Sequence, residues 1–294
     1  MISGTFGWMA ASPNVGASIA ALFAGGAPGV WYEPGLTWPM RQDILGSPLV
    51  TAGSQPVGFM PDKRMGLQYD ADVLNGGFDA DSVWTKGEGW VISSGVTAYT
   101  LGTSAAITQT SPVLLAVGDW VEFTYSIVTR DRGFVYPVVA GAVTQNGRSY
   151  EKASPGTYTQ LIKITTITSQ QIGVAAGGSP VNISVDNLSV RRLRGSHAAQ
   201  ATAAARPVYA TGPDRLVFDG IDDAHITTFP TALGSNCTVA RAIPGVGAQI
   251  LTGQNIGTSF TNTITHAGML IVPRPLTPAE TAAVTAYLKA RAGL

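Results

Sequence analysis

Charged residues are scarce in this sequence. They make up 12% of the chain, about half of the roughly 25% that is usual in globular proteins. The 18 Lys and Arg residues equal the 18 Asp and Glu residues in number, so there is no basic excess to bind nucleic acid. Because a neutral, sparsely charged surface gives little repulsion between copies, this composition favours a protein that works in an assembly.

Cysteine is nearly absent, and long apolar runs are missing. Cys237 is the only cysteine, which excludes a disulfide within the chain. No run reaches the roughly 18 apolar residues that a membrane span requires, so we expect no membrane insertion. The first residues, MISGTFGWMAASPNVG, contain no basic stretch, and Pro13 and Gly16 interrupt their apolar run. We therefore expect no signal peptide.

What the sequence does contain is typical of β-structure. The 35 Gly and 18 Pro residues suit short strands joined by turns. Residues 120–128, WVEFTYSIV, alternate between apolar and polar side chains, as in a strand with one buried face. Further strand-like runs, separated by turn residues, lie at 134–143, 159–168, 171–176 and 181–190. This spacing predicts a β-sandwich or jelly roll. The alternation slips by one residue near Asp186 and Asn187, which predicts a β-bulge.

Two short helices are expected, one towards each end of the chain. Ser12 and Pro13 match an N-cap followed by proline at the first helical position, and Gly25 begins the glycine pair that would stop this helix. Thr277 and Glu280 match a capping box at the start of a C-terminal helix. The expected fold class is therefore mainly β, with two jelly-roll-like sandwich domains and these two helices.

The middle section carries motifs of a known group of domains. Residues 74–95, LNGGFDADSVWTKGEGWVISSG, contain an Asn-Gly-x-Phe turn followed by a tryptophan pair. Residues 181–193, VNISVDNLSVRRL, end the section on an Asp-Asn strand. In these features the section resembles the carbohydrate-binding-module-like jelly rolls of bacteriophage tail and virion proteins.

The flanking sequence resembles a second phage pattern, which is related to laminin-G/concanavalin-like sandwiches. The matching pieces are GAPGVWYEPG, QPVGFMPDK, SHAAQATAAARPVY, LVFDGIDD and LIVPRPLTPAE. In such proteins the Asp-Lys pair is normally followed within a few residues by the HAxQATxAARP segment. Here the whole middle section separates Asp62-Lys63 from His197.

The resemblance therefore implies an insertion. Residues 1–72 and 194–294 would form one discontinuous domain, and residues 73–193 would form an inserted jelly roll whose ends lie close together. About 70 residues follow FDGIDD, which is short for a laminin-G-like sandwich. The outer domain is thus either a reduced sandwich or one that a neighbouring subunit completes.

Aromatic residues of the middle section are candidates for binding a sugar. Trp84 and Trp90 could form a platform on which a sugar ring stacks. Alternatively, they fill one end of the jelly-roll core, as large aromatic residues usually do, and the sequence favours this second interpretation. Tyr150 follows the QNGR turn and is expected to be the best-exposed platform residue. Tyr99, Trp120 and Tyr136 are further candidates.

Acidic residues give two candidate calcium sites. Asp79 and Asp186, together with backbone carbonyls around 75–78, would supply the oxygen ligands that calcium prefers, and resembling jelly rolls often hold a structural ion where the first and last strands meet. The alternative is that Asp79 caps a turn and Asp186 satisfies the bulge. Asp219, Asp222 and Asp223 form a denser cluster, but Asp-Gly at 219–220 is itself a hairpin signal, which favours a solvated turn.

No catalytic constellation is visible in the sequence. His197, His225 and His266 are scattered, whereas a zinc site needs three or four converging ligands. There is no G-x-S-x-G elbow, phosphate-binding loop or dinucleotide fingerprint. A pair of catalytic carboxylates leaves no spacing signature, but phage enzymes that degrade polysaccharide generally use a long repetitive β-helix, which is absent here. We therefore expect no enzyme.

These observations and resemblances together predict a structural component of a tailed phage particle. It would be a tail-fibre, collar or head-decoration protein of the virion that forms a homo-oligomer, such as a trimer, and contacts other virion proteins. The alternative is an adhesin or receptor-binding protein whose jelly roll binds a host-surface glycan. A polysaccharide-degrading tail enzyme has the least support.

Overall fold

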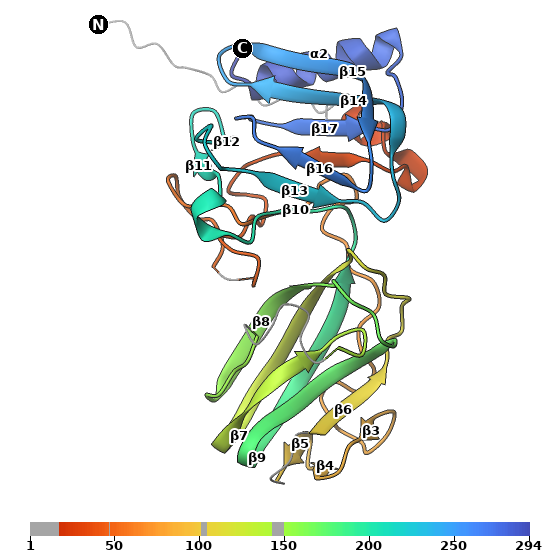
Figure 1. Ribbon diagram of the computed structural model, residues 1–294, viewed down its shortest axis with the longest axis vertical. Coiled ribbons are helices and arrows are strands. Elements are labelled where there is room, and N and C mark those ends of the chain that lie inside the picture. Colours follow the sequence, from red (N-terminus) through yellow and green to blue (C-terminus); the bar gives the residue numbers. More distant parts are fainter. Residues whose placement is uncertain (1–17, 47, 101–104, 143–149) are drawn as a thin grey trace, which may run out of the picture. The chain divides into compact units, whose positions relative to one another are not determined.

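The structure, a computed structural model, describes residues 18–46, 48–100, 105–142 and 150–294. It is a mainly β protein with sheets packed as sandwiches and a short helix towards each end (Figure 1), as the sequence predicts. The chain divides into two compact units: unit 1 comprises residues 1–40, 50–66 and 195–294, and unit 2 comprises residues 41–49 and 67–194. Residues 41–49 and 67–72, which the sequence assigns to the outer domain, thus belong to unit 2.

Unit 1 is a sandwich of two four-stranded sheets. The first has the order β1 (Val30–Tyr32), β17 (Met269–Val272), β14 (Gly234–Ile243) and β15 (Gly247–Ile256). The second has the order β16 (Ser259–Asn262), β13 (His225–Thr228), β10 (Ala198–Ala199) and β2 (Phe59–Met60). A separate hairpin joins β11 (Val208–Ala210) and β12 (Arg215–Val217).

Strand β17 shows why the first sheet is apolar on both faces. Met269 and Ile271 point into the core between the two sheets, whereas Leu270 and Val272 point to the opposite face. That face is covered by helix α2 (Pro278–Arg291). All four side chains are buried, which explains the continuous apolar sequence of this strand.

Helix α2 begins with the capping box that the sequence predicts. The Thr277 side chain accepts a hydrogen bond from the Glu280 N–H, and the Glu280 carboxylate accepts one from the Thr277 N–H. The helix buries Val284, Tyr287 and Leu288 against the sheet. Among the residues that the structure describes, no helix has the length and apolar character needed to cross a bilayer.

The expected N-terminal helix is described only over its last part. Residues 18–21 are α-helical, and a 3-10 turn, η1 (Ala24–Gly26), follows. Gly25 and Gly26 have φ values of 67° and 77°, a left-handed backbone that ends a helix readily because glycine has no Cβ. The expected start at Ser12 and Pro13 lies outside the described residues.

The three segments of unit 1 are joined through the buried side chain of Asp62. Its carboxylate accepts hydrogen bonds from the backbone N–H groups of Trp31 and Ser196, at 3.1 and 3.0 Å, and from the Arg64 guanidinium at 2.7 Å. The Asp62 N–H in turn donates to Nδ1 of His197 at 3.0 Å. Residues from all three segments of unit 1 therefore share one core and one buried polar network.

Unit 2 is built around two long strands, β7 (Trp120–Val138) and β9 (Gln171–Leu193), which pair along most of their length. The others are β3 (Thr85–Lys86), β4 (Trp90–Ser93), β5 (Val96–Tyr99), β6 (Ala105–Thr110) and β8 (Gly156–Lys163). The main sheet has the order β3-β6-β9-β5-β4, and β7 pairs with both β8 and β9. Inward side chains of β7 and β9 form a large part of the main core of unit 2. Tyr136, Val138 and Ala175 form a second, smaller cluster.

The predicted bulge in β9 is confirmed. Thr124 of β7 lies opposite Ser189, but Ser126 lies opposite Asp186, so β9 contains one extra residue here. Asn187 takes a φ of 53°, a conformation that asparagine tolerates better than most residues. The shift turns Leu188 into the core, where it is buried, as the slip in the sequence pattern indicates.

Candidate functional site

The two tryptophans proposed as a sugar platform lie in the core of unit 2. Trp84 is 8% exposed and Trp90 is 4% exposed. The Trp84 ring lies 5.1 Å from that of Phe78, and the Trp90 ring lies 5.2 Å from that of Tyr99. The Trp84 indole N–H donates to the carbonyl of Asn75 at 3.0 Å. In this arrangement the rings fill the jelly-roll interior, and neither offers an open face for a sugar to stack on.

The expectation that Tyr150 is exposed is wrong. Only 1% of its surface is accessible, and its hydroxyl donates to the carbonyl of Leu161 at 2.9 Å. Its own carbonyl accepts from the Gln160 amide at 3.2 Å. The sequence marks a turn just before Tyr150, but the fold directs the ring inward against β8. The other aromatic candidates, Tyr99, Trp120 and Tyr136, are buried as well.

The proposed calcium ligands lie on different elements of unit 2. Asp79 is exposed in the turn before β3, and Asp186 is partly buried at the bulge of β9. The nearby carbonyls of Asn75 and Gly76 already accept hydrogen bonds, from the Trp84 indole and from the backbone of β9. Two of the carbonyl oxygens that could bind calcium are therefore already hydrogen-bonded within the protein. Calcium binding by Asp79 and Asp186 stays a prediction.

A calcium ion shared by Asp79 and Asp186 would tie the turn to β9, so its removal should destabilise unit 2. We expect EDTA to lower the Tm in scanning calorimetry and excess Ca²⁺ to restore it. The paired substitutions Asp79→Asn and Asp186→Asn should abolish this response, whereas Asp222→Asn in the other acidic cluster should retain it. A Tm that is the same with and without chelator would remove the ion from this site.

The denser acidic cluster lies in the turn between β12 and β13 of unit 1. Asp219, Asp222 and Asp223 each place one carboxylate oxygen within 4.8 Å of the others. Asp219 Oδ1 accepts from the N–H groups of Ile221, Asp222 and Asp223, and Asp223 Oδ2 accepts from the Asp219 N–H at 2.9 Å. These backbone hydrogen bonds lower the pKa of Asp219. The cluster is therefore explained as a turn that its own carboxylates hold together.

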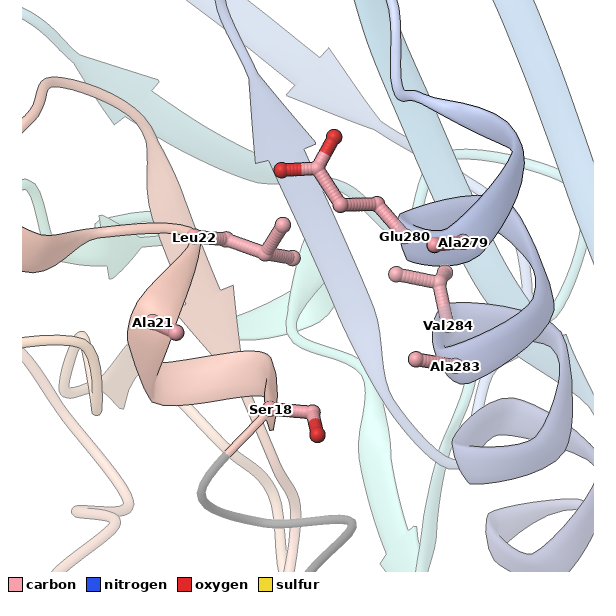
Figure 2. A pocket seen from close by; sticks show the side chains of 7 residues that line it. All are labelled: Ser18, Ala21, Leu22, Ala279, Glu280, Ala283 and Val284. Atoms are coloured by element: carbon pink, nitrogen blue, oxygen red, sulfur yellow. The ribbon is translucent and has the colours of Figure 1, made fainter.

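One pocket of unit 1 lies between the N-terminal helical segment and α2, and Figure 2 shows its lining. Its volume is about 240 Å³. The walls are mostly small or apolar: Ser18, Ala21, Leu22, Ala279, Glu280, Ala283 and Val284. The Glu280 carboxylate is bound by Arg274 at 2.7 and 2.8 Å, and these hydrogen bonds lower its pKa to about 2. With its one carboxylate engaged, the pocket suits an apolar group rather than catalysis.

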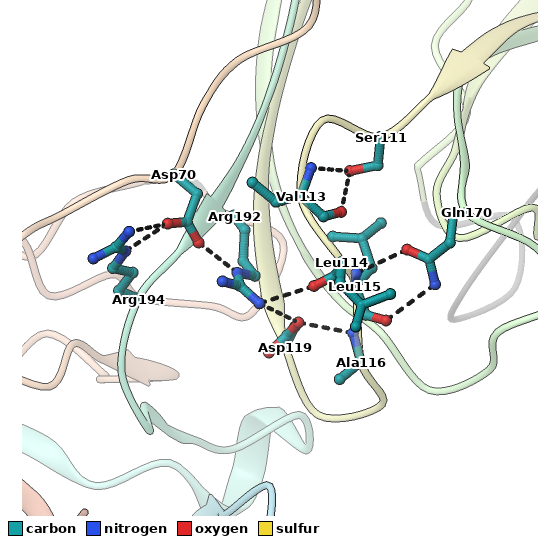
Figure 3. Close-up of polar contacts among 10 residues, drawn as sticks. All are labelled: Asp70, Ser111, Val113, Leu114, Leu115, Ala116, Asp119, Gln170, Arg192 and Arg194. Carbon is teal, nitrogen blue, oxygen red and sulfur yellow. Dashed lines mark hydrogen bonds and ion pairs between the residues drawn. The ribbon is translucent and has the colours of Figure 1, made fainter. Parts of the chain in front are cut away.

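The most distinctive surface feature of unit 2 is the loop at 111–119, SPVLLAVGD, shown in Figure 3. Its backbone is fixed by the side chain of Gln170. The Gln170 Oε1 accepts from the Leu115 N–H at 2.8 Å, and its Nε2 donates to the Leu115 carbonyl at 3.2 Å. The Ser111 N–H donates to the Gln170 carbonyl at 2.7 Å. One glutamine therefore holds both ends of the loop's first turn.

Arg192 fixes the same loop from β9. Its Nη1 donates to the carbonyl of Leu114 at 2.9 Å and lies 3.4 Å from Asp119 Oδ2. The same Asp119 oxygen accepts from the Ala116 N–H at 2.8 Å. Arg192 also binds Asp70, which binds Arg194 on its other oxygen. Burial alone would raise the pKa of Asp70, but its hydrogen bonds to the two arginines lower it.

These polar contacts present two apolar side chains to solvent. Leu114 is 78% exposed and Val117 is 56% exposed, whereas Leu115 is buried in the core of unit 2. Exposed aliphatic residues on a loop with fixed backbone lose little entropy on binding. Such a pair suits an apolar pocket on another protein surface. The loop is the candidate functional site of unit 2.

Sequence reasoning did not predict this site. The only local signal is an apolar run, 113–117, bracketed by Pro112 and Gly118, which reads equally well as a short buried strand. The loop backbone that places Leu114 outward is held by Gln170, 55 positions after Leu115, and by Arg192, 78 positions after Leu114. A contact across that separation leaves no spacing pattern in the sequence.

No protein-family model matches the chain, and no curated protein matches it. The resemblance to phage virion domains therefore stays a prediction that rests on the sequence motifs.

Proposed function

We propose that this chain is a structural component of a tailed phage particle, surface-exposed and oligomeric, which acts by binding other protein surfaces. The observation that carries this proposal is the rigid loop at 111–119, whose Leu114 and Val117 are exposed while its backbone is hydrogen-bonded on both sides. A tail-fibre, collar or head-decoration role is supported by the sequence motifs and by the low, balanced charge.

The histidines support a non-catalytic role. His197 accepts a hydrogen bond from the Asp62 N–H, and His225 is bonded through Nε2 to the Val57 carbonyl at 2.8 Å. All three histidines, including His266, are buried in unit 1. A general acid or base must reach a substrate, and side chains enclosed in this way do not.

The alternative role, a glycan-binding adhesin, has less support. Its three proposed platform residues, Trp84, Trp90 and Tyr150, are core residues of unit 2. Glycan binding would need a different aromatic surface.

The proposal predicts that the chain is a stoichiometric part of the particle. In virions purified from the phage that encodes it, quantitative mass spectrometry should detect many copies per particle, and antibody against the chain should label intact particles. The purified chain should give no signal on a glycan array and release no reducing sugar from host envelope. Absence from particles would reject the structural role. A glycan signal would favour the adhesin, and sugar release would favour the enzyme.

A further inference from the structure

We propose that residues 41–46 form a strap that covers the free edge of β8, and that the strap stays in place only while unit 1 is folded. By its contacts the strap belongs to unit 2, whereas the residues on either side of its loop, Met40 and Val50, belong to unit 1. Such a device acts within one chain, whatever role the chain has in a particle.

The two ends of the loop that contains the strap are held together in unit 1. The Val50 N–H donates to the Met40 carbonyl at 2.9 Å, and both side chains are buried in the core of unit 1. Further along the loop, the Gln42 N–H donates to the Pro48 carbonyl at 2.9 Å, and the Gln42 side-chain amide donates to the Leu49 carbonyl at 3.0 Å. The loop is therefore a narrow excursion whose ends are fixed as long as unit 1 is folded.

The strap is shaped by two of its own side chains. Asp43 Oδ1 accepts from the N–H groups of Leu45 and Gly46 at 2.9 and 3.0 Å, which closes a turn of the kind that aspartate favours. The Arg41 guanidinium donates to the Gly46 carbonyl and lies 3.6 Å from Oε2 of Glu122 on β7. These contacts fix the backbone of Leu45 and Gly46, the two residues that meet β8.

The strap meets β8 backbone to backbone at Leu161. The Leu161 N–H donates to the Leu45 carbonyl at 2.9 Å, and the Leu45 side chain packs against the main core of unit 2. At Gly46 the approach is too close for a side chain, because an added Cβ would lie 2.6 Å from the Leu161 nitrogen and 3.1 Å from the carbonyl carbon of Gln160. Gly46 also has a φ of 100°, which glycine adopts more readily than other residues.

This contact lies on an edge of the sheet. Among the strands that the structure describes, β8 pairs with β7 and with no other. An open edge strand offers its N–H and C=O groups to strands of other chains, and folded proteins commonly cover such edges. At Leu161 both groups are already used: the strap accepts from the N–H, and the Tyr150 hydroxyl donates to the carbonyl at 2.9 Å. The strap thus closes the edge of β8 at this point.

The hold of the strap on β8 depends on its fixed ends. One backbone hydrogen bond and the partly buried Leu45 side chain stabilise the contact by less than the conformational entropy that is lost when the whole loop is ordered from a flexible chain. While folded unit 1 holds Met40 and Val50 together, most of that entropy is already lost, so docking is favourable. When unit 1 unfolds, the strap leaves β8. The edge is therefore closed only in a chain whose unit 1 has folded.

Amide exchange at Leu161, measured by NMR on the full-length chain, tests the strap. The Ile162 amide points to β7, because successive amides of a strand alternate in direction, and it reports on the strand itself. Gly46→Ala should displace the strap, so the Leu161 amide exchanges at least tenfold faster while the Ile162 amide is unchanged. Gly66→Ala is the matched control, since Gly66 also has a positive φ, 67°, but an added Cβ there meets nothing within 4 Å. If Gly46→Ala also exposes Ile162, Asp43→Ala removes the turn without adding atoms and should affect Leu161 alone.

The same measurement at rising urea tests the dependence on unit 1. In the unmodified chain, the loss of Leu161 protection should coincide with the unfolding of unit 1, which the amides of β13 report. Met269→Ala weakens the core of unit 1 and should shift both transitions to lower urea by the same amount. In the Gly46→Ala background it should have no further effect on Leu161. A Leu161 transition that Met269→Ala does not move would reject the dependence on unit 1. Equal Leu161 exchange in the Gly46→Ala and Gly66→Ala variants would reject the strap.

Discussion

Lowering the pH from 7 to 4 is expected to unfold unit 1 while unit 2 stays folded, because two histidines are buried in unit 1 in their neutral form. Burial lowers the pKa of His225 to about 4. Burial, together with the electrostatic effect of His225, Arg241 and Arg291, lowers the pKa of His266 to about 3. In unfolded chains histidine titrates near pH 6.5.

The sign of the effect follows from proton uptake. Between pH 6.5 and the folded pKa values, the unfolded chain binds more protons than the folded chain, so acidification favours unfolding. The stabilising contribution is fully present above pH 6.5 and is lost as the pH falls towards 4 and then 3. Each pH unit in this window removes up to about 1.4 kcal/mol per histidine. Burial raises the pKa values of Asp62 and Asp223 in the same unit, and these two groups act in the opposite direction. The carboxyl groups of Glu33, Asp219 and Glu280, whose pKa values are lowered, act in the same direction as the histidines.

Hydrogen exchange resolves the two units in one sample. After correction for the intrinsic rate at each pH, peptides from β13 should lose protection between pH 6.5 and 4, whereas peptides from the first half of β7 should keep it. Unit 2 has no histidine and serves as the internal control. His225→Gln retains a donor for the Val57 carbonyl and should shift the loss of β13 protection to lower pH. Equal protection of β13 at pH 7 and pH 4 would show that these histidines do not control the stability of unit 1.

The features that the sequence predicts are those that a few neighbouring residues determine. The capping box of α2 needs only Thr277 and Glu280, three positions apart, and it forms as expected. The bulge of β9 is visible in the sequence because Leu188 breaks the alternation of one strand. In both cases the side chains that decide the structure lie within one turn or one strand pair.

The features that the sequence does not predict are decided by partners far along the chain. Tyr150 follows a turn sequence, but its direction is decided by the backbone of β8, to which its hydroxyl donates. Leu114 belongs to an apolar run, and it is exposed because the side chains of Gln170 and Arg192 hydrogen-bond to the loop backbone. Local composition predicts only the average exposure of such residues. Long-range contacts determine whether each side chain faces the core or the solvent.

The Asn-Gly turn at the start of unit 2 provides the sharpest mutational test of its packing. Gly76 lies against the bulge of β9, and the Leu188 N–H donates to its carbonyl at 2.8 Å. A Cβ added to Gly76 would lie 1.9 Å from the Leu188 carbonyl oxygen and 3.0 Å from its carbonyl carbon. Both are backbone atoms of a paired strand, so no side-chain rotation relieves the clash. We expect Gly76→Ala to destabilise unit 2 by about 3 kcal/mol, the upper part of the usual range for overpacking.

Gly77→Ala is the matched control, because it changes the next residue of the same turn by the same methyl group. Its added Cβ would meet nothing closer than the Asp79 carboxylate at 3.4 Å, an ordinary contact with an exposed side chain. Both substitutions restrict the unfolded chain equally, so the difference between them isolates the contact with β9. In urea titrations monitored by hydrogen exchange of β9 peptides, the Gly76→Ala variant should unfold at a clearly lower urea concentration than the Gly77→Ala variant. Coincident transitions would mean that the turn does not pack on the bulge, and the close approach that joins the first and last parts of unit 2 would have to be abandoned.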